Sequence, residues 1–345
     1  MEALFGKTLE ELKIVAAENG LPGFTAKQMA QWLYTKGVSD IDDMTNLSKD
    51  ARDRLKEKYI IGRVAPSKVQ ASVDGTKKYL YPAQKGLFIE AAYIPEKERH
   101  TLCISSQIGC KMGCLFCMTG KQGFQGQLTA GEIVNQVISL PESDQLTNIV
   151  YMGMGEPMDN VENVLKSLEI FTSDWGMGWS PRRFNVSTIG VEPAMRRFIE
   201  ESDAHLAISL HTPFNEERKK LMPIEQVYPI EEVIDSLKEY DFGRQRRISF
   251  EYIMFDGVND TPAHVKGLTK LLNGIRCRIN LIRFHPIPDS PLRGSSDEKI
   301  KWFSDQLNRK GLTTTIRRSR GEDIYAACGL LSTKNMLKED TEKDY

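Results

Sequence analysis

The sequence of 345 residues predicts an α/β protein with a partial (βα)6-type barrel, preceded by a small N-terminal helical domain and a β-hairpin linker. Three observations predict this fold. Residues 1–65 show helical spacing of apolar residues, and residues 66–95 contain two aromatic and β-branched segments around a turn. From residue 96 to residue 330, strand-like and helix-like segments alternate, which is typical of parallel βα units. We expect residues 331–345 to form a flexible tail.

The N-terminal residues predict three short helices. Leu9, Leu12 and Val15 recur at helical spacing, and Gly20–Gly23 breaks the pattern before a second helix that begins near Thr25. Asn46 or Ser48 could cap a third helix. The aromatic residues of the second helix, Trp32 and Tyr34, fit either core packing, which we favour, or a contact with nucleic acid.

Strands are predicted after this domain, first as a hairpin and then as the parallel strands of the barrel. The hairpin strands are 77–80 and 87–93, and Glu90 lies in the second of them, either on a solvent face or pointed into a site. The barrel strands are 102–105, 148–152, 183–187, 206–210, 248–254, 278–284 and 313–317. A helix follows at 129–140, where Thr129 and Glu132 form a capping-box pattern. Chemistry in such barrels lies on the loops after the strands.

Composition places the chain among ordinary cytoplasmic enzymes. Hydrophobic residues make up 40% and charged residues 27% of the chain, and no apolar run approaches the roughly 18 residues of a membrane span. The N-terminus is too polar for a signal peptide, so we expect a cytoplasmic protein without membrane contact. The net charge of −1 gives no hint of nucleic acid, but residues 276–320 hold eleven basic and four acidic residues, which indicates a basic face.

Three cysteines, Cys110, Cys114 and Cys117, follow the first barrel strand on one tight loop. A structural zinc site would need a fourth ligand at a comparable spacing. Three thiolates suit a four-iron cluster in which one iron stays open to a small molecule with an amine and a carboxylate. A chance cluster in a buried turn, or a disulfide, is the alternative.

With Phe116 just before the last cysteine, this loop resembles the signature of the radical S-adenosylmethionine (radical SAM) superfamily. The resemblance implies a [4Fe-4S] cluster on Cys110, Cys114 and Cys117. It also implies that Gly155 and Glu156, in a Gly-Glu-Pro motif, bind the methionine amine of S-adenosyl-L-methionine. Polar residues at the ends of later strands are further candidates for cofactor binding: Ser187, Ser209, His211 and His285. Each lone histidine could equally be a structural residue.

Three cysteines remain, of which Cys277 fits a small buried hydrophobe. The segments around Cys103 and Cys328, together with Phe-Glu-Tyr-Ile-Met and the N-terminal Met-Thr-Asn-Leu-Ser, resemble the RlmN family of adenine-C2 RNA methyltransferases. The resemblance covers nearly the whole chain and implies that residues 1–65 contact RNA. At His285 the sequence departs from the family, most of whose members carry Asn there.

The resemblance implies a methyl-carrier mechanism. Cys328 would become S-methylcysteine, and a deoxyadenosyl radical would activate its methyl group for addition to adenine C2. Glu90 would accept the C2 proton, and Cys103 would resolve the adduct through a transient disulfide with Cys328. Each turnover would use two molecules of S-adenosylmethionine.

The implied substrates are 23S rRNA and the adenine 3′ of the anticodon in tRNA. The implied partner is a flavodoxin-type electron donor, and we expect a monomer. Three alternatives remain: a related C8-adenine rRNA methyltransferase of the resistance type, a radical SAM enzyme for small molecules or peptides, and a non-catalytic iron–sulfur RNA-binding protein.

Overall fold

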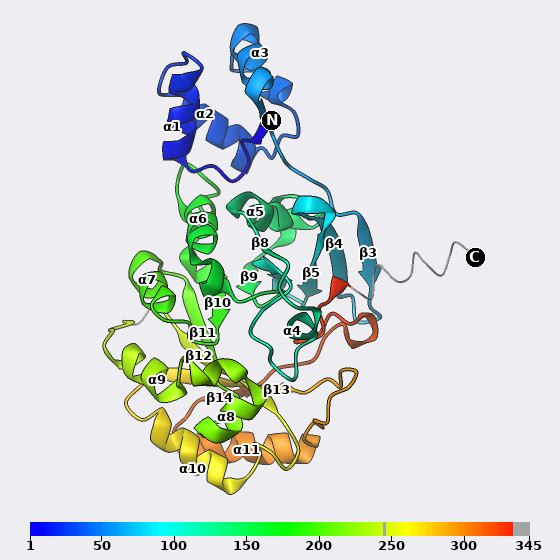
Figure 1. The fold of residues 1–345 in the computed structure, drawn as a ribbon, viewed down its shortest axis with the longest axis vertical. Helices are drawn as coiled ribbons and strands as arrows, with labels where there is room; N and C mark the ends of the chain where they lie inside the picture. Colours follow the sequence, from blue (N-terminus) through cyan, green and yellow to red (C-terminus); the bar gives the residue numbers. More distant parts are fainter. Residues whose placement is uncertain (244–245, 334–345) are drawn as a thin grey trace, which may run out of the picture.

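The computed structural model describes residues 1–243 and 246–333. Within them one sheet of ten strands runs through the molecule (Figure 1). Its strands are β3 (Lys68–Ala71), β4 (Lys77–Pro82), β5 (Phe88–Pro95), β6 (His100–Cys103), β9 (Asn148–Tyr151), β10 (Phe184–Thr188), β11 (His205–Ser209), β12 (Ile248–Met254), β13 (Cys277–Arg283) and β14 (Thr314–Ile316). Their order is β14-β13-β12-β11-β10-β9-β6-β5-β4-β3. Within the described residues the two end strands, β14 and β3, do not pair with each other, so the barrel is open.

The seven strands from β6 to β14 in this sheet are parallel, as the alternating pattern predicted. Each observed strand overlaps its predicted range, and β12 matches it at both ends. The predicted α/β fold with an open sheet of parallel βα units is confirmed. Parallel strands place their carboxyl ends along one edge, so the loops that follow them lie near one another.

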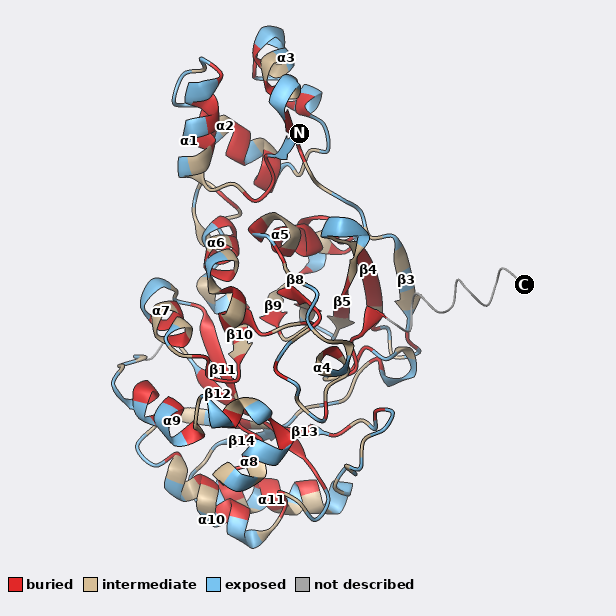
Figure 2. Cartoon of the chain, in the orientation of Figure 1, coloured by how far each residue is buried: buried red, intermediate tan, exposed pale blue. Residues whose placement is uncertain are grey.

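Helices follow the parallel strands and lie outside the sheet in Figure 1. They are α4 (Met118–Gln122), α5 (Ala130–Ile138), α6 (Val161–Thr172), α7 (Ala194–Glu201), α8 (Asn215–Leu221), α9 (Ile230–Lys238), α10 (Pro262–Leu271) and α11 (Asp297–Arg309). Thr129 and Glu132 form the predicted capping box at the start of α5. Red, buried residues run along β4 and β12 and cover much of α5 in Figure 2, because these elements carry the apolar side chains of the core.

The hairpin segment differs from the predicted linker. Residues 66–95 form three antiparallel strands rather than two, and β5 pairs directly with β6 through Ala92 and Cys103. The segment is therefore a continuation of the central sheet. This joins Glu90 on β5 to the same sheet as the first barrel strand.

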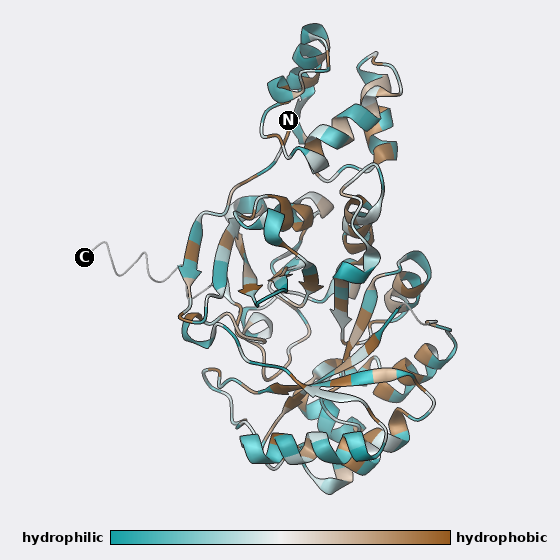
Figure 3. Cartoon of the chain, turned by 180° about the vertical axis from the view of Figure 1, so that it is seen from behind, coloured by the Kyte–Doolittle hydropathy of each residue, from teal (hydrophilic) through white to brown (hydrophobic). Residues whose placement is uncertain are grey.

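The N-terminal domain contains α1 (Leu9–Glu18), α2 (Thr25–Ala30) and α3 (Lys49–Lys58), and β1 (Glu2–Ala3) pairs with β2 (Tyr59–Ile60) to close it. Ser48 caps α3 by accepting a hydrogen bond from the Ala51 amide, whereas Asn46 binds the Trp32 indole. Tyr34 is buried and donates a hydrogen bond to the Lys7 carbonyl at 2.6 Å, which agrees with core packing. Helix α3, rich in charged residues, is mostly teal in Figure 3.

The prediction that the flexible tail begins at residue 331 is wrong, because residues 331–333 are buried. Leu331, Ser332 and Thr333 are 5%, 1% and 6% exposed, because they pack beside α4 and β5. The remainder of the predicted tail, 334–345, lies outside the described residues. No helix in the described part of the chain is long and apolar enough to cross a membrane.

Candidate active site

The three-cysteine loop lies between β7 (Gln107–Ile108) and α4, after the carboxyl end of β6. It begins at Gly109, whose φ of +73° suits glycine, and a Cβ there would lie 1.7 Å from the Gly123 carbonyl oxygen. The Leu115 amide donates a hydrogen bond to the Leu221 carbonyl at 3.0 Å, which ties the loop to the end of α8. Phe116 packs edge-on against His211, with ring centroids 4.8 Å apart. Backbone and side-chain contacts thus hold the loop in one conformation.

Cys110, Cys114 and Cys117 are free thiols at intermediate exposure. Burial raises the pKa of Cys110 to about 12 and that of Cys114 well above its usual value, so the thiolates would form as metal displaces their protons. No group of three or more His, Cys, Asp or Glu side chains in the described ranges converges on a single metal ion. Three soft sulfur donors on one loop fit an iron–sulfur cluster.

The predicted Gly-Glu-Pro loop follows β9 and lies against the strand β7. Gly155 has a φ of +102°, and a Cβ there would lie 2.5 Å from the Gln107 Cβ. The Glu156 carboxylate accepts hydrogen bonds from the amides of Met158 at 3.0 Å and Ile189 at 3.1 Å. Burial raises the pKa of Glu156 to about 7, and no cation is paired with it among the described residues. A buried carboxylate without a cation fits the ammonium group of a cofactor.

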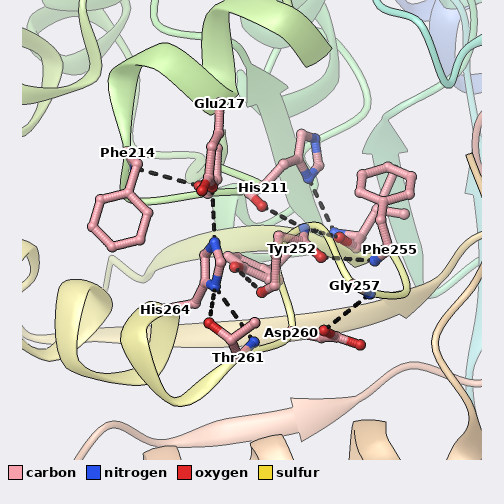
Figure 4. A network of polar contacts seen from close by, with 12 residues as sticks. His211, Phe214, Glu217, Tyr252, Phe255, Gly257, Asp260, Thr261 and His264 are labelled. Carbon is pink, nitrogen blue, oxygen red and sulfur yellow. Dashed lines mark hydrogen bonds and ion pairs between the residues drawn. The ribbon is translucent and has the colours of Figure 1, made fainter.

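The polar residues at strand ends have different surroundings. Ser187 on β10 and Ser209 at the end of β11 are half-buried. His211 is 3% exposed, and its Nδ1 accepts a hydrogen bond from the Ile253 amide at 3.1 Å (Figure 4). Burial lowers the pKa of His211 to about 3, so the ring is neutral. His211 supports Phe116, and its binding of the cofactor remains a prediction.

A cavity of about 750 Å³ opens between the sheet and the segment that carries Cys328. Cys103, Cys117, Cys328 and His285 line it. Its wall is rich in arginine: Arg99, Arg182, Arg183, Arg247, Arg278, Arg317, Arg318 and Arg320. The cavity therefore brings one cysteine of the three-cysteine loop, both additional thiols and a strong positive charge together. Glu90, Gly155, Glu156, Ser187, Ser209 and His211 do not line it.

The two additional cysteines come from distant parts of the chain. Cys103 ends β6, and exposed Cys328 follows the short 3-10 helix η8 (Glu322–Ile324). The next residue, Gly329, accepts a hydrogen bond from the Met118 amide at 2.8 Å, so the Cys328 segment lies directly beside the cysteine loop. Both cysteines are free thiols, and the expected disulfide remains a prediction.

Arg317 lines the same cavity as the two thiols. Charges on Cys328, Glu251 and Cys103 raise the pKa of Arg317, and its guanidinium donates to the Glu251 carboxylate at 3.3 Å. Burial and, to a smaller extent, Cys328 raise the pKa of the Cys103 thiol to about 12, although Arg317 lowers it. In the sequence Arg317 was part of the basic segment 276–320, and its place beside the two thiols is a finding of the structure.

Glu90 is fully buried on β5. Its Oε1 lies 3.2 Å from the Lys78 Nζ, and its Oε2 accepts a hydrogen bond from the Ser332 amide at 2.9 Å. Burial raises the pKa of Glu90 to about 7, although Lys78 lowers it. Sequence reasoning missed Lys78. The pairing register of the hairpin could have indicated Lys78. Leu80 pairs with Glu90, and Lys78 lies two residues from Leu80 on the same face of the sheet.

Comparisons with known proteins agree with this geometry. Residues 104–266 match the family model described as the radical SAM superfamily. Residues 3–61 match the ribosomal RNA large subunit methyltransferase N-terminal domain. A crystal structure of a radical SAM methyltransferase from Sphaerobacter thermophilus superposes with a TM-score of 0.89 at 39% identity, over 96% of this chain and 99% of that one. The fold and the three-cysteine site thus define a radical SAM protein.

Curated relatives narrow the class. A probable dual-specificity RNA methyltransferase RlmN from Parabacteroides distasonis is 58% identical over 96% of both chains. The dual-specificity RNA methyltransferase RlmN of Syntrophus aciditrophicus is 43% identical over 95% of both chains. The chain belongs to the RlmN family of the radical SAM superfamily, as its motifs predicted.

Proposed function

We propose that this protein is a radical SAM RNA methyltransferase that methylates C2 of one adenine in 23S rRNA and of the adenine 3′ of the anticodon in tRNA. Its relatives of 55–58% identity are named as probable dual-specificity RNA methyltransferases, which supports both substrates. The observation that carries the proposal is the shared cavity. Cys103 and Cys328 line the same arginine-rich space as the cluster cysteine Cys117.

The cysteine loop would hold a [4Fe-4S] cluster, and Glu156 would bind the ammonium group of S-adenosylmethionine. When bound, these groups supply one-electron chemistry that activates a C–H bond. Cys328 is the methyl carrier in this proposal, since its exposed thiol lies beside the cysteine loop. Its Sγ would take one methyl group from S-adenosylmethionine, and a second S-adenosylmethionine would be consumed in the radical step.

Glu90 and Cys103 would release the methylated base. A Glu90 carboxylate oxygen would accept the C2 proton, for which a pKa of about 7 suits a base at neutral pH. The Cys103 thiolate would attack the Cys328 sulfur and break its bond to the methylene carbon, which would leave with the bonding electron pair and take up a proton to become the methyl group of the product. The disulfide that remains would be reduced by an external reductant. Arg317, beside both thiols, would stabilise the Cys103 thiolate.

The adenine must leave its stack to reach these thiols. The arginines around the cavity would contact the neighbouring phosphates, and the N-terminal domain would extend this contact along the RNA. A flavodoxin-type protein would donate electrons to the cluster. The methyltransferase itself would act as a cytoplasmic monomer.

Mass spectrometry of the protein purified from producing cells tests the carrier role. We expect a methyl group on Cys328 and, in Cys103→Ala, a covalent adduct between the protein and RNA. The variant Cys277→Ala, at a cysteine outside the cavity, should give no adduct. An unmodified Cys328 without an adduct, in protein that holds its cluster, would refute the two-cysteine mechanism.

The C8-adenine methyltransferase of the resistance type shares the cluster and both thiols. The match of residues 3–61 and the identity to RlmN proteins favour C2. Nucleoside analysis of the modified RNA separates 2-methyladenosine, which we expect, from 8-methyladenosine.

A further inference from the structure

Arg218 on α8 is one of the largest fully buried side chains in the protein. Its Nη2 donates hydrogen bonds to the carbonyls of Ser209 at 2.9 Å and Ile189 at 3.1 Å, and its Nε donates to Leu210 at 3.2 Å. These carbonyls belong to the carboxyl ends of β10 and β11 and their loops. Arg218 thus holds together the part of the sheet from which the predicted cofactor contacts arise.

Glu225, also buried, forms an ion pair with Arg218. Its other carboxylate oxygen accepts a hydrogen bond from the Ile230 amide at 3.0 Å. Burying two charges costs free energy that their attraction only partly offsets, so a buried pair is weak evidence for stability alone. The position of the pair relative to the cysteine loop indicates a further role.

The cysteine loop packs against residues 219–224, the segment between Arg218 and Glu225. The Leu115 amide binds the Leu221 carbonyl at 3.0 Å, and a Cβ on Gly113 would lie 3.9 Å from Pro223 Cγ. Both contacts flank Cys114. Arg218 lies one helical turn before Leu221 on the same face of α8. It also donates to the Ile189 carbonyl at 3.1 Å, and the Ile189 amide donates to Glu156 at 3.1 Å, so the guanidinium lies close to the predicted cofactor site.

Helix α8 is also held from its other side, so Arg218 cannot easily turn away. Glu217 contacts His264 Nε2 of α10 at 2.7 Å and accepts a hydrogen bond from Thr212 at 2.7 Å (Figure 4). His264 contacts Thr261 in turn, at the start of α10. The guanidinium is therefore a charge at a fixed position.

We propose that Arg218 is a positioning residue that keeps a positive charge behind Cys114 and so raises the reduction potential of the cluster. A four-iron cluster with three thiolates is negatively charged and gains one more negative charge on reduction. A nearby cation in a low-dielectric site stabilises the reduced form more than the oxidised form. Glu225 fixes the guanidinium and weakens its effect through its own charge.

Redox titration with electron paramagnetic resonance tests this role in anaerobically reconstituted full-length protein. We expect Arg218→Met to lower the midpoint potential and Glu225→Gln to raise it, each at the iron and sulfide content of the wild type. Arg218→Lys keeps the charge with fewer hydrogen bonds, and should lose thermal stability while its potential stays near that of the wild type.

Arg246 provides the matched control. It also donates to backbone carbonyls, those of Ile199 at 2.7 Å and Ala204 at 2.9 Å, but at the opposite ends of the strands. Arg246→Met should lose stability without a change in potential. Equal potentials in the wild type, Arg218→Met and Glu225→Gln would overturn the proposal, as would the same shift in Arg246→Met.

This inference rests on the proposed cluster, but the two can fail separately. A wild-type protein that takes up no iron and sulfide would refute the proposed function. A wild-type protein with a cluster, together with unshifted variants, would refute only the role of Arg218. If Arg218→Met does not fold, the comparison of Glu225→Gln and Arg218→Lys with the wild type still decides the question.

Discussion

The buried pair of Lys78 and Glu90 shows how one contact sets the chemistry of a residue. Burial favours the protonated carboxyl group of Glu90, and the Lys78 ammonium 3.2 Å away favours the carboxylate. The net result is a pKa of about 7, which is above the usual value of a glutamate. A base must be deprotonated to act, so the rate should increase as the pH rises through this value.

Replacement of Lys78 by Met should shift the pH profile of methylation to higher pH, because the buried carboxylate loses its counter-charge. At pH 7 the rate should fall several-fold and recover partly at higher pH. Formation of methyladenosine, followed across pH, measures this effect. Lys77→Met is the control, since the neighbouring Lys77 pairs instead with Glu142 at 2.7 Å. Identical profiles for both variants would show that Lys78 does not set the pKa of Glu90.

At the scale of elements, the start of α5 joins the hairpin to the barrel. Thr129 accepts a hydrogen bond from the Glu132 amide, and the Glu132 carboxylate accepts from the Thr129 amide at 2.8 Å. The other Glu132 oxygen accepts from the Gln84 amide at 2.8 Å, between β4 and β5. One side chain therefore caps the helix and anchors the hairpin that carries Glu90.

Thr129→Ala should cost about 1 kcal/mol of stability through loss of the cap. Glu132→Ala should cost more, because it also releases the Gln84 amide. Thermal unfolding of both variants measures these losses. Glu232→Ala, in the first turn of the uncapped helix α9, should change stability by less than about 0.5 kcal/mol. An equal loss for Glu132→Ala and Glu232→Ala would contradict the anchoring role.

At the scale of the whole molecule, the fold gathers positive charge around the cavity, although the chain as a whole is almost neutral. The chain has a net charge of −1, yet among the described residues eight arginines and only two carboxylates, Glu96 and Glu251, line the cavity. RNA affinity should therefore fall steeply with salt, because bound arginines displace counterions from phosphates.

Arg182→Gln combined with Arg183→Gln should weaken RNA binding and reduce the salt slope by roughly 1.4, at about 0.7 for each phosphate contact of a single strand. The double variant Arg196→Gln and Arg197→Gln removes the same charge from α7, where both arginines form ion pairs outside the cavity. Its slope should match that of the wild type. Binding isotherms at several salt concentrations measure this slope. An equal reduction of the slope in both double variants would contradict RNA binding by the arginines of the cavity.

Patterns within a few residues were sufficient to predict most elements. The alternation of strand-like and helix-like segments predicted the parallel strands, and the Thr129 and Glu132 spacing predicted a helix start, because these signals depend on neighbours along the chain. The third strand β3 was missed, since its short segment shows apolar and aromatic residues only weakly. The family resemblance, carried by Cys103, Cys328 and the cysteine loop, was confirmed by the relatives.

What the sequence determined by itself was the class of chemistry, because three cysteines with their spacing and the Gly-Glu-Pro motif are local features. Only the tertiary structure decided which charges face those residues. Ser332 meets Glu90 from 242 positions away, and α8 carries Arg218 to the loop that holds Cys114. Such contacts depend on how the sheet and its helices pack, and packing brings together residues that share no local pattern.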